Sequence, residues 1–115
     1  MADLSSASRA YQQGASHRAM RDQQAEVFRA VNGGLRNASR AGAIAQARAI
    51  SENRRLWTTV LGLMRDPANP LPEALRASII SVGLAIQRNM DQENPDFDFL
   101  IATNENIASG LSGRA

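Results

Sequence analysis

Hydrophobic side chains recur along most of this chain at intervals of three and four residues, which is the spacing of one face of an α-helix. This periodicity predicts four amphipathic helices, over residues of about 18–40, 43–65, 72–91 and 96–110. Alanine is abundant and aromatic residues make up only 4% of the chain, which favours helices over a sheet. We therefore expect an all-α fold, a small bundle of about four amphipathic helices.

Glycine and proline separate the predicted helices. Gly42 is expected to mark the turn after the first helix, and segment 66–72 ends the second because three prolines within six residues cannot continue it. Pro72 suits the first turn of the third helix. Segment 94–96 resembles the start of the fourth helix, with acidic residues near the positive end of its dipole. Gly33-Gly34 weakens the first helix by about 1 kcal/mol per glycine relative to alanine, so we expect a bend or a close helix approach there.

Each predicted helix has an apolar face that we expect to line the core. In the first helix this face comprises Met20, Val27, Phe28, Val31, Leu35 and Ala38. In the third helix it comprises Leu75, Ile79, Val82, Ile86 and Met90. Ile80 and Leu84 face away from that stripe, with Ala77 one turn earlier. Either the third helix is covered on both sides, or a partner helix covers this second apolar strip.

The first 15 residues are expected to form an N-terminal arm. Apart from Met1, their only sizeable apolar side chains are Leu4 and Tyr11, which share helical spacing with Ala7. This surface is too small to fold alone, so we expect a flexible or conditionally helical arm that orders against the body or a partner. Residues 16–112 are expected to form a single helical domain, because 115 residues support one modest core.

Composition narrows the classes of function. The chain has no cysteine and no lysine, and its one histidine, His17, lies in the polar N-terminal region. A nucleophilic triad and a thiolate metal site therefore lack suitable residues. A helical carboxylate centre is not expected either, because Glu26, Glu52 and Glu73 fall on polar faces and no Glu-x-x-His occurs. We expect no enzymatic activity, no metal and no cofactor. The N-terminus lacks the pattern of a signal peptide, and no segment approaches the roughly 20 apolar residues of a membrane span. We expect a cytoplasmic protein without membrane insertion.

The basic residues do not form a dedicated nucleic-acid surface. All thirteen are arginine, which raises the isoelectric point to about 10.4 although the net charge is only +2. Acidic residues alternate with the arginines along most of the chain, whereas a nucleic-acid binder usually concentrates positive charge on one face or in a tail. The charge distribution therefore argues against direct nucleic-acid binding, although the pair Arg54-Arg55 keeps an RNA-associated regulator as the alternative.

Asn53 and Asn104 each interrupt an otherwise apolar stripe. A buried amide costs free energy unless its hydrogen bonds are made. The two amides either satisfy one another or nearby backbone as a structural polar core that fixes helix register, or grip the backbone of a partner. Both interpretations stay open at the level of the sequence.

Trp57 is the only tryptophan, with Arg54 one turn before it and Leu61 one turn after it. It either anchors the core or forms the wall of a groove, since tryptophan and arginine dominate binding hot spots. On the second interpretation, the residues expected to contact a partner are Tyr11, Arg54, Trp57, Leu61, Ile80 and Leu84.

Several segments, taken in order, resemble the FlaF family of flagellar biosynthesis regulators from alphaproteobacteria. They are Asn53-Arg54-Arg55-Leu56-Trp57-Thr58, Pro70-Leu71-Pro72, Leu75-Arg76-Ala77-Ser78-Ile79-Ile80-Ser81 and Ile107-Ala108-Ser109-Gly110-Leu111, and Tyr11 fits as well. The resemblance implies a cytoplasmic protein that binds flagellin subunits as a secretion chaperone and acts with the translational regulator FlbT. It implies no catalytic residues.

We therefore expect a flagellin-binding, chaperone-like adaptor that regulates flagellin synthesis and export. The alternative is an RNA-associated post-transcriptional regulator of flagellin translation. A homodimer in which the third helices pair is compatible with either function.

Overall fold

The computed structural model describes the backbone of residues 4–111 and the side chains of Ser8 and residues 21–111. Within this range the chain forms four helices and no strand: α1 (Leu4–Ala38), α2 (Ala43–Arg65), α3 (Glu73–Met90) and α4 (Phe97–Leu111). The predicted all-α class is confirmed.

Helix α1 begins well before the expected start near residue 18. Most of the segment expected as a separate arm is the first part of this helix. Its alanine, arginine and glutamine residues are good helix formers, and no proline precedes Pro67, so nothing in the sequence stops the helix from extending backwards. The side chain of Tyr11 lies outside the described residues.

Gly42 and the proline-rich segment define the first two turns, as expected. Gly42 has φ +105°, a left-handed conformation that suits glycine, and it precedes the first turn of α2.

The side chain of Arg76 in α3 (Glu73–Met90) holds the proline-rich segment to the end of α2. Its Nε donates to the carbonyl of Leu71 at 3.1 Å, and its guanidinium also donates to the carbonyls of Met64 and Asp66 at 3.3 and 3.4 Å. Arg76 thereby supplies donors to carbonyls at the end of α2 that lack partners within the helix.

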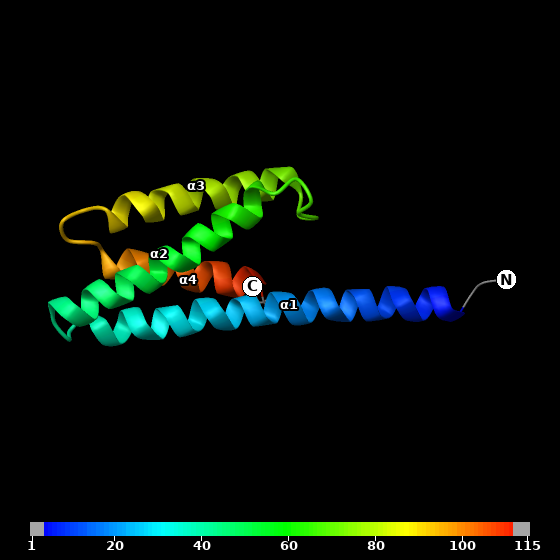
Figure 1. The fold of residues 1–115 in the computed structure, drawn as a ribbon, viewed down its shortest axis with the longest axis horizontal. Coiled ribbons are helices and arrows are strands. Elements are labelled where there is room, and N and C mark those ends of the chain that lie inside the picture. The colour runs from blue at the N-terminus through cyan, green and yellow to red at the C-terminus, as the bar shows by residue number, and fades with distance from the viewer. Residues whose placement is uncertain (1–3, 112–115) are drawn as a thin grey trace.

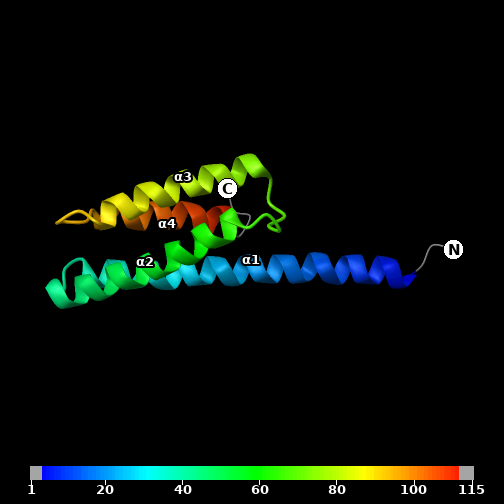
Figure 2. The ribbon, with the colours of Figure 1, turned by 45° about the horizontal axis from the view of Figure 1, so that its top comes forward.

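The helices form an elongated molecule of 64 × 25 × 23 Å. The C-terminal half of α1 contacts α2 and α4, and α2 crosses from α1 to α3 (Figure 1). Helix α4 lies between α1 and α3 in both views (Figure 2). The N-terminal part of α1, a helix about 52 Å long in total, projects beyond the other three helices.

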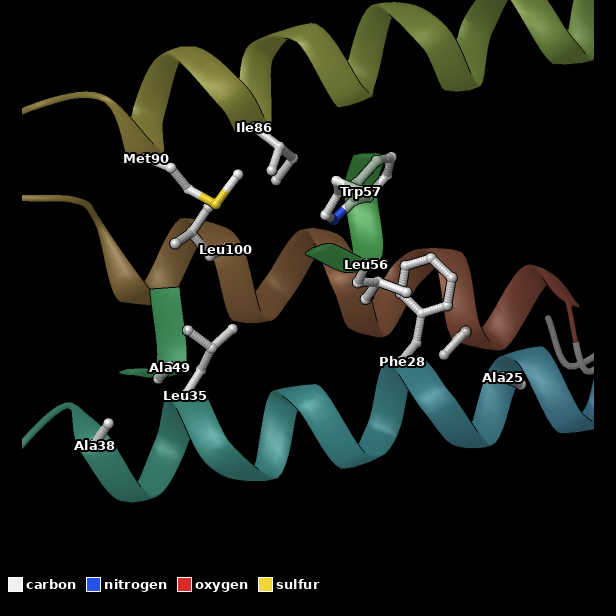
Figure 3. Packing of buried hydrophobic residues seen from close by; sticks show 11 residues of the cluster. Ala25, Phe28, Leu35, Ala38, Ala49, Leu56, Trp57, Ile86, Met90 and Leu100 are labelled. Carbon is white, nitrogen blue, oxygen red and sulfur yellow. The ribbon is translucent and has the colours of Figure 1, made fainter. Parts of the chain in front are cut away.

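The core is built around Trp57, which is fully buried. The ring of Phe28 from α1 meets it edge to face, with centroids 5.7 Å apart and planes at 79°. Ile86 from α3 and Leu100 from α4 belong to the same cluster (Figure 3). All four helices therefore contribute to one core.

Two residues expected on inward faces are exposed. Val27 is 47% exposed because the buried line of α1 runs through Ala25, Phe28 and Leu35, and Val27 is rotated about 100° from its neighbour Phe28. Leu75 is 46% exposed in the first turn of α3. In both helices the buried face is therefore narrower than the apolar face that the spacing predicts.

The close helix approach lies at Gly83 and not at Gly33-Gly34. A Cβ at Gly33 or Gly34 would meet no described atom within 4 Å, and α1 continues through both residues. At Gly83 a Cβ would lie 2.7 Å from Leu61 Cδ2 and 3.0 Å from Trp57 Cε3. The absence of a side chain at Gly83 lets α3 pack closely on α2.

Candidate functional site

Two asparagines and Trp57 form a hydrogen-bonded chain inside the bundle. The Trp57 Nε1–H donates to Asn104 Oδ1 at 2.8 Å, and Asn104 Nδ2 donates to Asn53 Oδ1 at 2.7 Å. Asn53 Nδ2 points to the sulfur of Met90 at 3.3 Å. All three polar residues are fully buried. This hydrogen-bonded chain joins α2 to α4 and reaches α3, so it fixes the register of three helices.

The order of donors in this chain follows from its chemistry. An indole N–H can only donate, so Trp57 requires the oxygen of Asn104. The amide of Asn104 then presents its NH₂ group to Asn53, which leaves the NH₂ group of Asn53 for the weakly accepting thioether. Asn53 and Asn104 thus satisfy each other, and neither amide reaches the surface.

A third buried amide, Asn32, was not singled out from the sequence. Its Nδ2 donates to the carbonyl of Ile101 at 2.9 Å and ties α1 to α4. Its Oδ1 has no hydrogen-bond partner among the described residues. Helical spacing could have identified it, because Asn32 lies on the inward face of α1 between Phe28 and Leu35. Asn53 and Asn104 lie on the inward faces of their own helices in the same way.

The structure separates the predicted partner-contacting residues into two groups. Trp57 and Leu61 are buried, which corrects the expectation that they line an exposed groove: α3 covers them at Gly83. Arg54 is partly exposed, and its Nη1 lies 2.9 Å from Asp91 Oδ1 at the end of α3. Ile80 is half-buried and Leu84 is 38% exposed, so these two remain available at the surface of α3.

A shallow groove of about 420 Å³ lies between the C-terminal half of α1 and the first half of α2. Small apolar residues dominate its lining, which comprises Ala30, Val31, Gly34, Asn37, Ala38, Ala41, Ala45, Arg48, Ala49 and Glu52. Arg48 and Glu52 are exposed and lie one turn apart on the α2 wall. The groove therefore combines an apolar floor with one charge of each sign at its edge.

None of the five predicted partner residues with described side chains lines this groove. Alanine and glycine carry no large apolar surface, so they did not stand out as contact residues. The signal that could have located them is their spacing. Ala30, Gly34 and Ala38 recur at four-residue intervals in α1, and Ala45 and Ala49 do so in α2.

A second hollow of about 730 Å³ lies on the other side of α2, against the segment that precedes α4. Its lining is more polar and includes Glu93, Asp96 and Asp98 beside Ile50 and Phe97. This composition suits an apolar helix face less well than the groove between α1 and α2.

Two features are absent from the described residues. No group of three or more histidine, cysteine, aspartate or glutamate side chains in that part of the chain is placed to hold a metal ion. Within the same residues, none of the helices combines the length and the hydropathy that a membrane-spanning segment needs.

Comparison with known proteins supports the resemblance noted in the sequence. Residues 7–111 match the family described as Flagellar protein FlaF. The comparisons with curated proteins and with solved structures give no match. The family match covers almost the entire chain, including the segments at Asn53–Thr58 and Ile107–Leu111. The chain therefore belongs to the FlaF family of flagellar proteins.

Proposed function

We propose that this protein is a non-catalytic, chaperone-like adaptor that binds flagellin subunits through the groove between α1 and α2. Membership of the FlaF family supports a flagellar role. The observation that carries the docking proposal is the groove itself, because seven of its ten lining residues are alanine, valine or glycine. Small side chains let the backbone of an incoming helix approach closely.

The dimensions of the groove fit a short length of helix. From Ala30 to Ala38, the last residue of α1, the groove extends about 12 Å along the helix at about 1.5 Å per residue, which corresponds to about two helical turns. An amphipathic helix would place apolar residues of one stripe on this floor. Arg48 and Glu52 at the edge would pair with charges that flank the stripe and so set the direction of the bound helix.

Flagellin subunits present a ligand of this kind before assembly. Their terminal segments become helical and amphipathic only once they are packed in the filament, so before assembly their apolar residues are uncovered and would form the helix on binding. An uncovered stripe invites non-specific association, which a chaperone prevents by covering it. A small contact of this kind gives a weak complex, with a Kd of about 1 to 50 µM, which suits a client that must be released for export.

The test is titration calorimetry of the full chain with purified monomeric flagellin. Gly34→Arg places a long side chain in the groove at an exposed helical position where a Cβ meets no described atom. Gly62→Arg is the matched control, because Gly62 is also an exposed helical glycine with free space but lies outside the groove. We expect Gly34→Arg to weaken flagellin binding at least tenfold and Gly62→Arg to change it less than twofold.

Two results would overturn this proposal. Absence of flagellin binding by the unmodified chain at tens of micromolar would remove the chaperone function, and equal affinities for the two arginine variants would remove the groove as its site. The same chain titrated with the leader of a flagellin transcript tests the alternative, whose signature is an affinity that falls steeply with salt. Adding FlbT to the flagellin complex tests whether that regulator is a second partner.

A further inference from the structure

Helix α3 carries a continuous stripe of exposed residues on the side away from the core. At about 100° per residue, Glu73, Ala77, Ile80, Ser81, Leu84 and Arg88 fall on one face of the helix. We refer to these six residues as the α3 outer stripe. All are exposed except Ile80, which is half-buried, and Figure 1 shows α3 at the outer edge of the molecule. The buried residues Gly83, Ile86 and Met90 lie on roughly the opposite face.

The middle of the α3 outer stripe is uncharged, and its charges lie at its two ends. No charged residue occurs from Ala77 to Gln87. Arg76, next to this segment, has its guanidinium turned to the carbonyls at the end of α2. The stripe therefore offers an apolar centre with an acidic residue, Glu73, at one end and a basic residue, Arg88, at the other.

This stripe is complementary to a second copy of itself in the antiparallel direction. We propose that two copies of the chain associate through α3 about a two-fold axis located between Ile80 and Ser81. Such an axis places Glu73 opposite Arg88, Ala77 opposite Leu84 and Ile80 opposite Ser81. Each large apolar side chain meets a small one, each carboxylate meets a guanidinium, and every contact occurs twice, as two-fold symmetry requires.

The parallel alternative lacks this match. It would bring Arg88 against Arg88 and Leu84 against Leu84, with the two helix dipoles aligned. The antiparallel arrangement opposes the dipoles and covers Leu84, the partly exposed leucine at the centre of the stripe. Charge and size complementarity thus select one direction and one register.

The proposed dimer is weak and leaves the groove between α1 and α2 open. An 18-residue helix is about 27 Å long, and a single pair of such helices falls at the low end of interface sizes, below about 1,200 Å². The dimer is therefore reversible at micromolar concentrations. Since no residue of α3 lines the groove, a dimer would present two grooves to clients.

Sedimentation equilibrium of the full chain between 1 and 500 µM tests the association. The mass of the unmodified chain is expected to rise from 12.4 kDa toward twice that value. Leu84→Glu is expected to stay monomeric over the whole range. Leu75→Glu is the control, because Leu75 is an exposed leucine of the same helix that lies off the stripe, and it should associate like the unmodified chain. Circular dichroism melting checks that both variants are folded.

Charge reversal tests the register. Glu73→Arg and Arg88→Glu each place like charges opposite each other twice, and each should weaken dimerisation about three- to tenfold at low salt. The double variant E73R/R88E should restore the affinity of the unmodified chain. Both charges also suit the ends of their own helix, so only this rescue identifies the intermolecular pair.

Three results would overturn the proposal. A monomer at 500 µM would exclude the dimer, and equal association of Leu84→Glu and the unmodified chain would place the interface elsewhere. Failure of the double variant to regain affinity would exclude the antiparallel register. If Leu84→Glu instead loses flagellin binding while the unmodified chain stays monomeric, the stripe belongs to a client and not to a second copy.

Discussion

Gly62 and Gly83 are helical glycines in very different surroundings. A Cβ at exposed Gly62 would meet no described atom within 4 Å, whereas at buried Gly83 it would press on Leu61 and Trp57. Gly62→Ala should raise the free energy of unfolding by about 0.5–1 kcal/mol through helix propensity. Gly83→Ala should lower it by about 1–3 kcal/mol, because the Leu61 side chain and the Trp57 ring must shift.

Urea unfolding followed by tryptophan fluorescence checks both variants with one assay. The expected result is a shift of the midpoint in opposite directions for the same substitution. Shifts of the same sign would contradict the close packing at Gly83, since helix propensity alone favours alanine at both positions.

The roles of single residues were only partly predictable from the sequence. Periodicity correctly identified Asn53 and Asn104 as amides within apolar stripes, because the face on which a residue lies follows from the sequence of its own helix. It could not show that Trp57 donates to Asn104, since that contact depends on how far α2 and α4 are displaced along each other. It placed Leu61 on an apolar face but could not decide between a core contact and a partner contact, because an apolar face does not reveal which helix covers it.

The hydrogen-bonded chain couples α2, α3 and α4, and its two asparagines should contribute unequally to the free energy of unfolding. Asn104→Ala leaves both the Trp57 Nε1–H and Asn53 Oδ1 without their partner inside the core. Asn53→Ala leaves only the NH₂ group of Asn104 unpaired, since the sulfur of Met90 is a weak acceptor that loses little. At about 1–3 kcal/mol for each unpaired buried group, we expect losses of about 2–5 kcal/mol for Asn104→Ala and about 1–3 kcal/mol for Asn53→Ala.

Denaturant titrations of the two single variants and the double variant measure this coupling. The double variant should lose less than the sum of the two single losses, because the bond between the asparagines is counted in both. A larger loss for Asn53→Ala, or strictly additive losses, would show that the chain of hydrogen bonds does not act as one unit.

Helix boundaries were predictable where the chain contains a stop. Helices α2, α3 and α4 begin and end within one residue of the predicted limits, because Gly42 and the prolines at 67–72 and 95 interrupt the backbone pattern. The start of α1 was misplaced by about 14 residues, from 18 to Leu4. Hydrophobic periodicity fades before residue 18 but helix propensity does not, so periodicity alone places the start of the helix too late.

At the scale of the whole molecule, the two surfaces proposed for partners differ in the number of helices that form them. The groove between α1 and α2 exists only because a turn at Gly42 brings two stripes of small residues side by side. Each stripe alone looks like an ordinary alanine-rich helix face. The α3 outer stripe lies within one helix, so Ile80 and Leu84 could be noted from the sequence, whereas the groove could not.

The projecting N-terminal part of α1 can be deleted to test protein stability and client binding separately. Among the described side chains, the first buried one is Ala25, and Figure 1 shows the preceding helix extending past the bundle. Deletion of residues 1–15 should therefore change the free energy of unfolding by less than about 0.5 kcal/mol, because no buried contact of the described core is removed. Thermal and urea unfolding of the shortened chain provide the measurement, and a loss above about 1 kcal/mol would show that this segment packs on the body.

The same shortened chain tests client binding. If its stability is retained while its affinity for flagellin falls, the deleted segment acts on the client directly, as expected of an arm that orders against a partner. Unchanged stability and unchanged affinity would confine client binding to the groove.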